Sequence, residues 1–216
     1  DLHPVAHSFP PRRSSDLARE NRPSQAEAEA QVPAQAPVDV PEDYMALVDR
    51  LRSTVAERPD DLQGQILLAR SEAAIGNYVA AYKTQERILS LKGEGATAKD
   101  YADLADMMVL AAGGYVSPEA QRALEAALAR DPQNGVARYY GGLMMAQTGR
   151  PDIAFRMWDR LLRESPSDAA WVPPVRAQIE EMAFRAGISD YQLPDAPAPR
   201  GPSQADIDAA GDVTAE

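Results

Sequence analysis

Apolar residues recur at helical spacing from residue 42 onward, and this pattern predicts a helical domain over residues 42–190. In the segment 42–58 they follow the spacing i, i+3, i+4, i+7 and i+11, at Tyr44, Leu47, Val48, Leu51 and Val55. This spacing gives a helix one apolar face. Alanine- and leucine-rich segments of similar length follow, separated by proline and glycine residues that end helices.

The helical region contains a repeat with a period of about 34 residues. The turn residues Pro59, Gly93, Pro132 and Pro166 are separated by 34, 39 and 34 residues, and the longer interval has its additional residues in loops. A 34-residue period is typical of the tetratricopeptide repeat, a pair of antiparallel helices. We therefore predict an all-α tetratricopeptide solenoid of three helix pairs. Capping helices are expected over 42–58 and over 175–186, the latter after a stop at residues 171–174.

Small residues at equivalent positions explain how the paired helices approach each other. Ala69, Ala105 and Gly142 align on the first helices, while Ala81, Ala120 and Ala154 align on the second helices. Glycine inside a helix costs about 1 kcal/mol relative to alanine, so Gly141 and Gly142 predict a close packing contact.

Two helix starts are predicted from capping residues. Thr97 and Asp100 resemble a capping box that begins the first helix of the second pair. Ser117-Pro118-Glu119 provides an N-cap, a proline at the first helical position and an acid near the helix start.

The two ends of the chain have a different composition. Residues 1–41 hold seven of the 18 prolines, and residues 191–216 hold four more with an excess of acid. Both are too poor in large apolar residues to offset the entropy of ordering, so we predict a disordered linker and a disordered, proline-rich acidic tail. Residues 1–17 resemble a translated sequencing adapter more than native protein, and the alternative is a genuine basic linker.

Charge and cysteine content argue against several function classes. The chain carries 22 Lys and Arg against 33 Asp and Glu, net −11, whereas nucleic-acid binding needs clustered basic charge. Cysteine is absent, and both histidines, His3 and His7, lie in the N-terminal segment. The domain therefore lacks the usual general base, thiolate and metal ligands. We expect no enzyme activity, no cofactor and no stable haem binding. We also recognise neither a signal peptide nor a membrane-spanning segment in these residues.

Four strings of the helical region are more specific than the repeat pattern. They are Leu89-Ser90-Leu91-Lys92-Gly93, Gly113-Gly114-Tyr115-Val116-Ser117-Pro118-Glu119-Ala120, Ala137-Arg138-Tyr139-Tyr140-Gly141-Gly142-Leu143 and Trp171-Val172-Pro173-Pro174. These strings closely resemble one family, the C-terminal tetratricopeptide domain of the cytochrome c maturation protein CcmI, also called CycH. The resemblance covers about residues 42–210.

The resemblance implies a chaperone that holds unfolded apocytochrome c through its C-terminal helix and delivers it to the haem-ligation complex. It also implies a periplasmic domain, tethered to the inner membrane by spanning helices in the full-length family member. A generic tetratricopeptide scaffold for assembly of a membrane complex is the alternative.

The candidate binding residues lie on the inner face of the first helix of each pair. Aligned spacing places there Gln63, Ile66, Arg70, Ala74, Lys99, Asp106, Val109, Val136, Tyr139, Leu143 and Gln147. Such a surface suits the apolar face of an amphipathic helix with polar residues at its rim. Core packing is the alternative for every aliphatic residue in this set, Val109 in particular.

Overall fold

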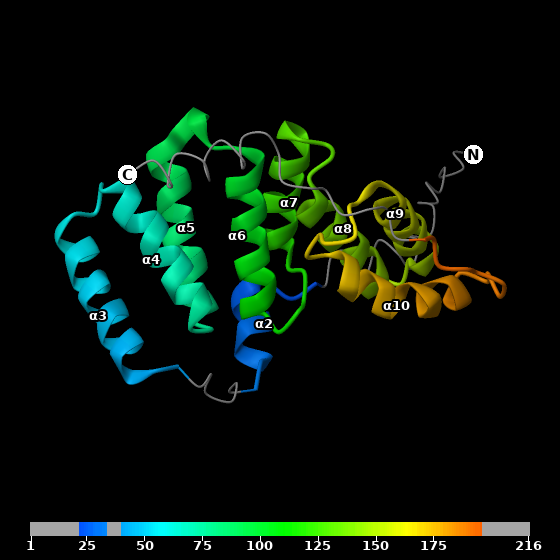
Figure 1. The fold of residues 1–216 in the computed structure, drawn as a ribbon, viewed down its shortest axis with the longest axis horizontal. Helices are drawn as coiled ribbons and strands as arrows, with labels where there is room; N and C mark the ends of the chain where they lie inside the picture. The colour runs from blue at the N-terminus through cyan, green and yellow to red at the C-terminus, as the bar shows by residue number, and fades with distance from the viewer. Residues whose placement is uncertain (1–21, 34–39, 196–216) are drawn as a thin grey trace, which may run out of the picture.

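The computed structural model of this protein describes residues 22–33 and 40–195, and over these residues its regular secondary structure is helical (Figure 1). The helices are α2 (Gln25–Gln31), α3 (Glu42–Glu57), α4 (Leu62–Ala74), α5 (Tyr78–Lys92), the 3-10 turn η1 (Gly93–Gly95), α6 (Ala98–Ala111), α7 (Pro118–Arg130), α8 (Gly135–Gln147), α9 (Pro151–Glu164) and α10 (Val172–Arg185). The predictions for residues 1–21, 34–39 and 196–216 lie outside the described residues.

The helices stack in chain order as three pairs with one additional helix at each side. Helices α4 and α5, α6 and α7, and α8 and α9 form the pairs, and α3 packs on α4 while α10 packs on α9. Figure 1 shows α3 to α7 side by side, from cyan to green, with α8 to α10 following. The predicted all-α tetratricopeptide solenoid with capping helices is confirmed.

The predicted helix starts are confirmed. The Thr97 hydroxyl accepts a hydrogen bond from the Asp100 amide at 3.2 Å, and the Asp100 carboxylate accepts one from the Thr97 amide at 2.8 Å, which completes the capping box. Ser117 caps α7 by accepting a bond from the Ala120 amide at 3.0 Å.

Close packing at Gly142 explains why this glycine stands inside α8. A Cβ atom added to Gly142 would lie 2.2 Å from Nε1 of Trp158, a side chain of α9 that is completely buried. The same Nε1 donates a hydrogen bond to the carbonyl oxygen of Tyr139 at 3.0 Å. The indole therefore lies directly on the α8 backbone, and the aligned Ala81, Ala120 and Ala154 are likewise buried, at 0% exposure.

The last helix begins earlier than predicted. Helix α10 starts at Val172, so Pro173 and Pro174 lie in its first turn and do not precede it. Proline is compatible with that turn because the first amide groups of a helix have no intrahelical acceptor. The Trp171 side chain at the helix start lies over Gly135, where an added Cβ would come within 2.1 Å of the ring.

Residues 22–33 differ from the expected disordered linker, because residues 25–31 form α2. Ser24 and Glu27 make a capping box around the helix start. Ala28 is 7% exposed, and the buried side-chain amide of Gln25 donates a hydrogen bond to the carbonyl oxygen of Met108 at 2.8 Å. The segment is therefore attached to the end of α6, far from α2 in sequence.

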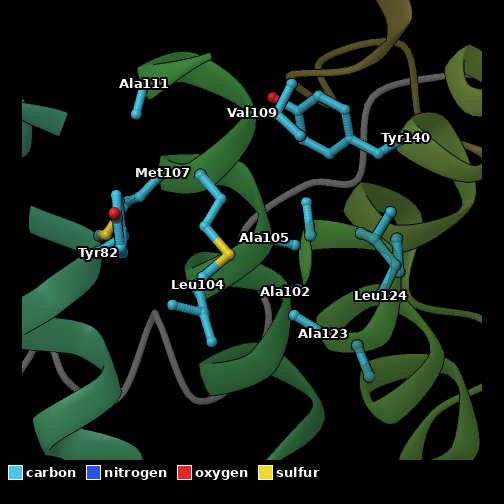
Figure 2. Packing of buried hydrophobic residues seen from close by; sticks show 14 of the residues in the cluster. Tyr82, Ala102, Leu104, Ala105, Met107, Val109, Ala111, Ala123, Leu124 and Tyr140 are labelled. Carbon is cyan, nitrogen blue, oxygen red and sulfur yellow. The ribbon is translucent and has the colours of Figure 1, made fainter. Parts of the chain in front are cut away.

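Two clusters of buried side chains make the core. The first lies among α4 to α8 and includes Ile88, Leu104 and Val109. Figure 2 shows its residues between α6 and the neighbouring helices. The second lies among α9 and α10 and includes Trp158 and Ile179. Tyr139 and Leu143 on α8 pack against both clusters and so connect them.

A buried ion pair attaches α3 to the solenoid. The carboxylate of Glu72 on α4 is only 2% exposed, and it accepts hydrogen bonds from Nε and Nη2 of Arg52 on α3 at 2.6 and 2.8 Å. Nδ2 of Asn77 donates a third bond at 2.9 Å. The three bonds satisfy a carboxylate whose burial would otherwise be costly.

Candidate peptide-binding surface

The first helices of the three pairs present equivalent positions at spacings of four, three and four residues, which place them on one face of a helix. We call these twelve positions the first-helix stripe. They are Gln63, Leu67, Arg70 and Ala74 on α4, Lys99, Asp103, Asp106 and Leu110 on α6, and Val136, Tyr140, Leu143 and Gln147 on α8. All except Tyr140 are exposed or partly exposed.

The structure places eight of the eleven predicted residues on this stripe. Ile66, Val109 and Tyr139 lie beside it. Ile66 is partly buried, whereas Val109 is 1% exposed and belongs to the first core cluster. A docked peptide would not reach Val109, so the structure supports core packing for this residue, the alternative left open by the sequence.

Leu67 belongs to the stripe although sequence analysis did not select it. Its side chain is 55% exposed, although α4 packs against a neighbouring helix on each side. The signal was present in the sequence, because Leu67 stands four residues after Gln63 and three before Arg70. Leu68, the next residue, belongs to the core at 8% exposure.

Three of the four large apolar side chains that are exposed among the described residues lie on α3 and α4. Tyr44 and Leu47 on α3 are 36% and 58% exposed, next to the helix that carries Leu67. Arg70, which is exposed, adds a cation on the same stripe as Leu67. Exposed leucines with a nearby charge favour contact with the apolar face of a partner polypeptide.

Polar side chains of the stripe on α6 bind one another or α8. Nζ of Lys99 lies 2.6 Å from a carboxylate oxygen of Asp103, one turn further along α6. The Tyr140 hydroxyl donates a hydrogen bond to Oδ1 of Asp106 at 2.5 Å. Burial raises the pKa of Asp106 above its ordinary value, and the bond from Tyr140, which lowers it, does not cancel this effect.

Gln147, at the end of the α8 stripe, supports a loop. Its Nε2 donates to the carbonyl oxygen of Gly114 at 2.8 Å, and its Oε1 accepts from the amide of Val116 at 3.0 Å. Both ends of the side-chain amide therefore hold the loop between α6 and α7. This geometry gives Gln147 a structural role in addition to the predicted binding role.

Tyr139 also has a structural role. Its ring stacks on Trp158 with centroids 6.1 Å apart, and burial raises the pKa of its hydroxyl. A substitution at Tyr139 would disturb the packing between α8 and α9, so it would not report specifically on ligand contact.

A cavity of about 560 Å³ lies away from the stripe, between the start of α8 and one face of α9. Three arginines line it, and two of them already have acidic partners: Arg138 binds Glu164 at 2.5 Å, and Arg156 binds Asp152 at 3.1 Å. Within the described residues, no group of three or more His, Cys, Asp or Glu is arranged to hold a metal ion.

Across residues 22–33 and 40–195, none of the helices combines the length and the apolar character needed to cross a membrane.

Comparison with known proteins confirms the resemblance expected from the sequence. The cytochrome c-type biogenesis protein CycH of Rhizobium meliloti (strain 1021) is 33% identical over 148 residues, which are 67% of this chain and 38% of the relative. The CycH protein of Bradyrhizobium diazoefficiens is 31% identical over 133 residues, 62% of this chain and 36% of the relative. The chain thus spans less than two fifths of the length of these curated relatives. No protein-family model matches it.

The fold is similar to that of a solved structure. The crystal structure of MamA superposes with a TM-score of 0.54 at 18% sequence identity, covering 68% of this chain and 81% of that chain. This likeness supports the helical architecture described above.

Proposed function

We propose that this chain, which is similar to the CycH proteins of cytochrome c biogenesis, binds apocytochrome c. In this proposal the first-helix stripe holds the C-terminal helix of the unfolded apocytochrome until it is delivered to the haem-ligation complex. The domain would act in the periplasm, beside the inner membrane. Its contribution is binding alone, without a covalent step.

The exposed Leu67 is the single observation that carries the proposal. It stands on the same helical face as Gln63, Arg70 and Ala74, all of which are exposed. An exposed leucine leaves its apolar surface in contact with water. A partner that covers the side chain removes this surface from water, which is favourable. A helix of four turns laid across this face would cover Leu67 with its apolar side and place polar groups near Gln63 and Arg70.

The expected affinity for such a helix is micromolar or tighter. An unfolded partner loses conformational freedom when its helix forms on the surface, so only part of the contact energy appears as affinity. This arrangement suits a protein that must hold its client and then release it.

The first test exchanges Leu67 for aspartate. We expect Leu67→Asp to weaken binding of a peptide from the C-terminal helix of a c-type apocytochrome by about tenfold or more, because a charge replaces a buried apolar contact. Fluorescence anisotropy of the labelled peptide measures the affinity. Phe184→Asp on α10 is the matched control, since Phe184 is 72% exposed and lies off the stripe; its affinity should equal that of the unchanged protein.

The second test reverses the charge of Arg70. Arg70→Glu should weaken peptide binding, whereas Arg185→Glu, the same change at an exposed position of α10, should not. Unchanged affinity in both Leu67→Asp and Arg70→Glu would reject the stripe as the binding surface. An assembly scaffold, the alternative, would bind a folded partner and show no affinity for the isolated helix.

A further inference from the structure

Residues 22–33, which we call the N-terminal segment, lie against the loop between α6 and α7, residues 112–117. Figure 1 shows α2, the helix of this segment, in dark blue beside the end of α6 and away from α3, the next helix in the chain. The side-chain amide of Gln25 donates to the carbonyl oxygen of Met108 on α6, and the Glu119 carboxylate on α7 accepts the backbone amide of Gln25 at 3.0 Å. Both helices that the loop connects therefore hold the segment.

The segment also binds the loop directly. The guanidinium of Arg22 donates a hydrogen bond to the carbonyl oxygen of Val116, and a second one to Oε1 of Gln121 at 2.6 Å fixes its direction. The Tyr115 hydroxyl donates to the carbonyl oxygen of Pro23 at 3.4 Å. The segment thus contacts the backbone and a side chain of two successive loop residues.

The first turn of the loop depends on such outside contacts. Gly113 and Gly114 have φ values of +62° and +94°, in the left-handed region that glycine enters easily. Because glycine backbone is the least restricted, two adjacent glycines leave the loop free to change conformation unless neighbours fix it. Val32 of the segment lies over Gly113, where an added Cβ would come within 3.1 Å of its Cγ2 atom.

The stripe binds the same loop through Gln147. Nε2 of Gln147 donates to the carbonyl oxygen of Gly114, and Oε1 accepts from the amide of Val116. The loop therefore lies between the N-terminal segment and the α8 end of the stripe, and its backbone contacts both.

Gln147 keeps hydrogen-bonding capacity for a ligand. A side-chain amide has two hydrogens on nitrogen and two lone pairs on oxygen, and the loop uses one of each. The side chain is exposed, so a polypeptide on the stripe can reach the remaining hydrogen and lone pair. Because the loop already orders this side chain, the ligand does not lose binding energy in ordering it.

We propose that the N-terminal segment regulates the peptide-binding site. While attached, it keeps the loop and Gln147 in the conformation that binds the ligand, and its detachment lowers the affinity and favours release. This inference rests on the function proposed for the stripe. A helix of seven residues has little stability of its own, so the attachment of α2 depends on the contacts described above.

The first test measures peptide affinity by fluorescence anisotropy with the full chain. Arg22→Ala removes the bond to Val116 and should weaken binding of the apocytochrome peptide about fivefold, because Gln147 must then be ordered by the ligand. Arg185→Ala on α10 removes the same charge at an exposed position and should bind as the unchanged protein does. Circular dichroism should show equal helix content of α3 to α10 in both variants, since Arg22 lies outside the stacked pairs.

The second test is a double-mutant cycle with Gln147→Ala. This substitution alone should also weaken the peptide, whereas adding Arg22→Ala to it should have no further effect, because the side chain that the segment holds is gone. Additive effects of the two substitutions would show that the segment does not act through Gln147 and would overturn the proposal.

The third test needs no ligand. If the loop couples the two surfaces, Gln147→Ala should speed hydrogen exchange of the α2 amides about threefold, while Gln63→Ala, the same change at the α4 side of the stripe, should leave it unchanged. Peptide binding to the unchanged protein should slow the same exchange, since coupling between two sites is reciprocal.

The outcomes separate this proposal from the function on which it rests. Equal peptide affinity of the unchanged and Arg22→Ala proteins would overturn the regulation and leave the proposed function in place. Absence of peptide binding to the unchanged protein would reject the proposed function and the regulation together. Equal α2 exchange in the unchanged and Gln147→Ala proteins would overturn the coupling whatever the peptide does.

Discussion

At the scale of single residues, the two adjacent glycines of α8 have different roles. A Cβ on Gly142 would collide with the Trp158 ring, whereas a Cβ on Gly141 would meet only the flexible end of Met157 at 3.0 Å. The sequence predicted a packing reason for both glycines. The structure gives a strict one only to Gly142, because the direction of each Cβ bond decides which neighbour it meets.

We expect Gly142→Ala to lower the free energy of unfolding by about 2 kcal/mol, since overpacking against Trp158 exceeds the gain in helix propensity. Gly141→Ala is the matched control and should be neutral or stabilising by up to about 1 kcal/mol. Urea denaturation followed by circular dichroism measures both. Equal effects of the two substitutions would contradict the packing seen at Trp158.

Asp106 provides a prediction about pH. Because burial raises its pKa in the folded state, the folded protein holds this proton more strongly than the unfolded chain. Its contribution to stability is fully present below the unfolded pKa of about 3.9 and is lost as the pH rises through the folded-state pKa.

Asp106→Asn keeps an acceptor for Tyr140 but does not titrate. The variant should therefore gain stability relative to the unchanged protein as the pH rises from about 4 to about 7. Urea denaturation at several pH values in this range measures the difference. If the stability of the variant relative to the unchanged protein stays constant with pH, or increases toward acid pH, the pKa of Asp106 is not raised in the folded state.

At the scale of helices, most elements could be predicted because their signals are local. The Ser117-Pro118 start of α7 and the Thr97 capping box of α6 depend on residues within one turn. Helix α2 has the same kind of signal at Ser24 and Glu27, but its position depends on Gln25 reaching the carbonyl oxygen of Met108. No local pattern encodes a contact between residues so far apart in sequence.

The candidate binding surface, too, could be predicted from the sequence only in part. The repeat period located the face that carries Gln63, Arg70 and Leu143, because equivalent positions on stacked helices follow from the alignment. It did not show that packing between α6 and α8 buries Val109, or that Leu67 remains open. These exposures depend on neighbouring helices, which differ from one repeat to the next.

Loss of the N-cap should destabilise α2 only locally, whereas loss of the N-cap of α6 should lower the stability of the whole domain. Ser24→Ala removes the cap of α2 and should raise hydrogen exchange of the α2 amides about fivefold, for a loss of about 1 kcal/mol, without changing global unfolding. Thr97→Ala removes the equivalent bond in α6, which is packed on both sides, and should lower global stability by about 1 kcal/mol. Loss of global stability in Ser24→Ala would mean that α2 is part of the cooperative core.

At the scale of the whole molecule, two core clusters are connected through Tyr139 and Leu143. Trp158 and Trp171 both belong to the second cluster or pack against it, and they are the two tryptophans of the chain. Both indoles also lie against glycines of α8, so tryptophan fluorescence reports unfolding of α8 to α10, whereas circular dichroism reports all helices.

Leu143→Ala should weaken the connection between the clusters. In stacked repeats, cooperativity depends on the contacts between neighbouring units. The unchanged protein should show coincident urea transitions by fluorescence and by circular dichroism, and Leu143→Ala should separate them. Leu89→Ala, at a partly buried position of the first cluster, is the control and should shift both transitions together. Coincident transitions in Leu143→Ala would show that other contacts couple the clusters.

Two side chains bind the loop between α6 and α7 through the backbone of a single residue, Val116. Val116 donates its N–H to Gln147 at the end of the stripe, and its carbonyl oxygen accepts Arg22 from the α2 segment. In a nitrogen-15 correlation spectrum, the cross-peak of Val116 reports the hydrogen bond to Gln147. The cross-peak of Ser117 reports the hydrogen bond from Arg22, because the Ser117 amide and the Val116 carbonyl belong to the same peptide group. Two adjacent resonances thus distinguish an event at the stripe from an event at the α2 segment.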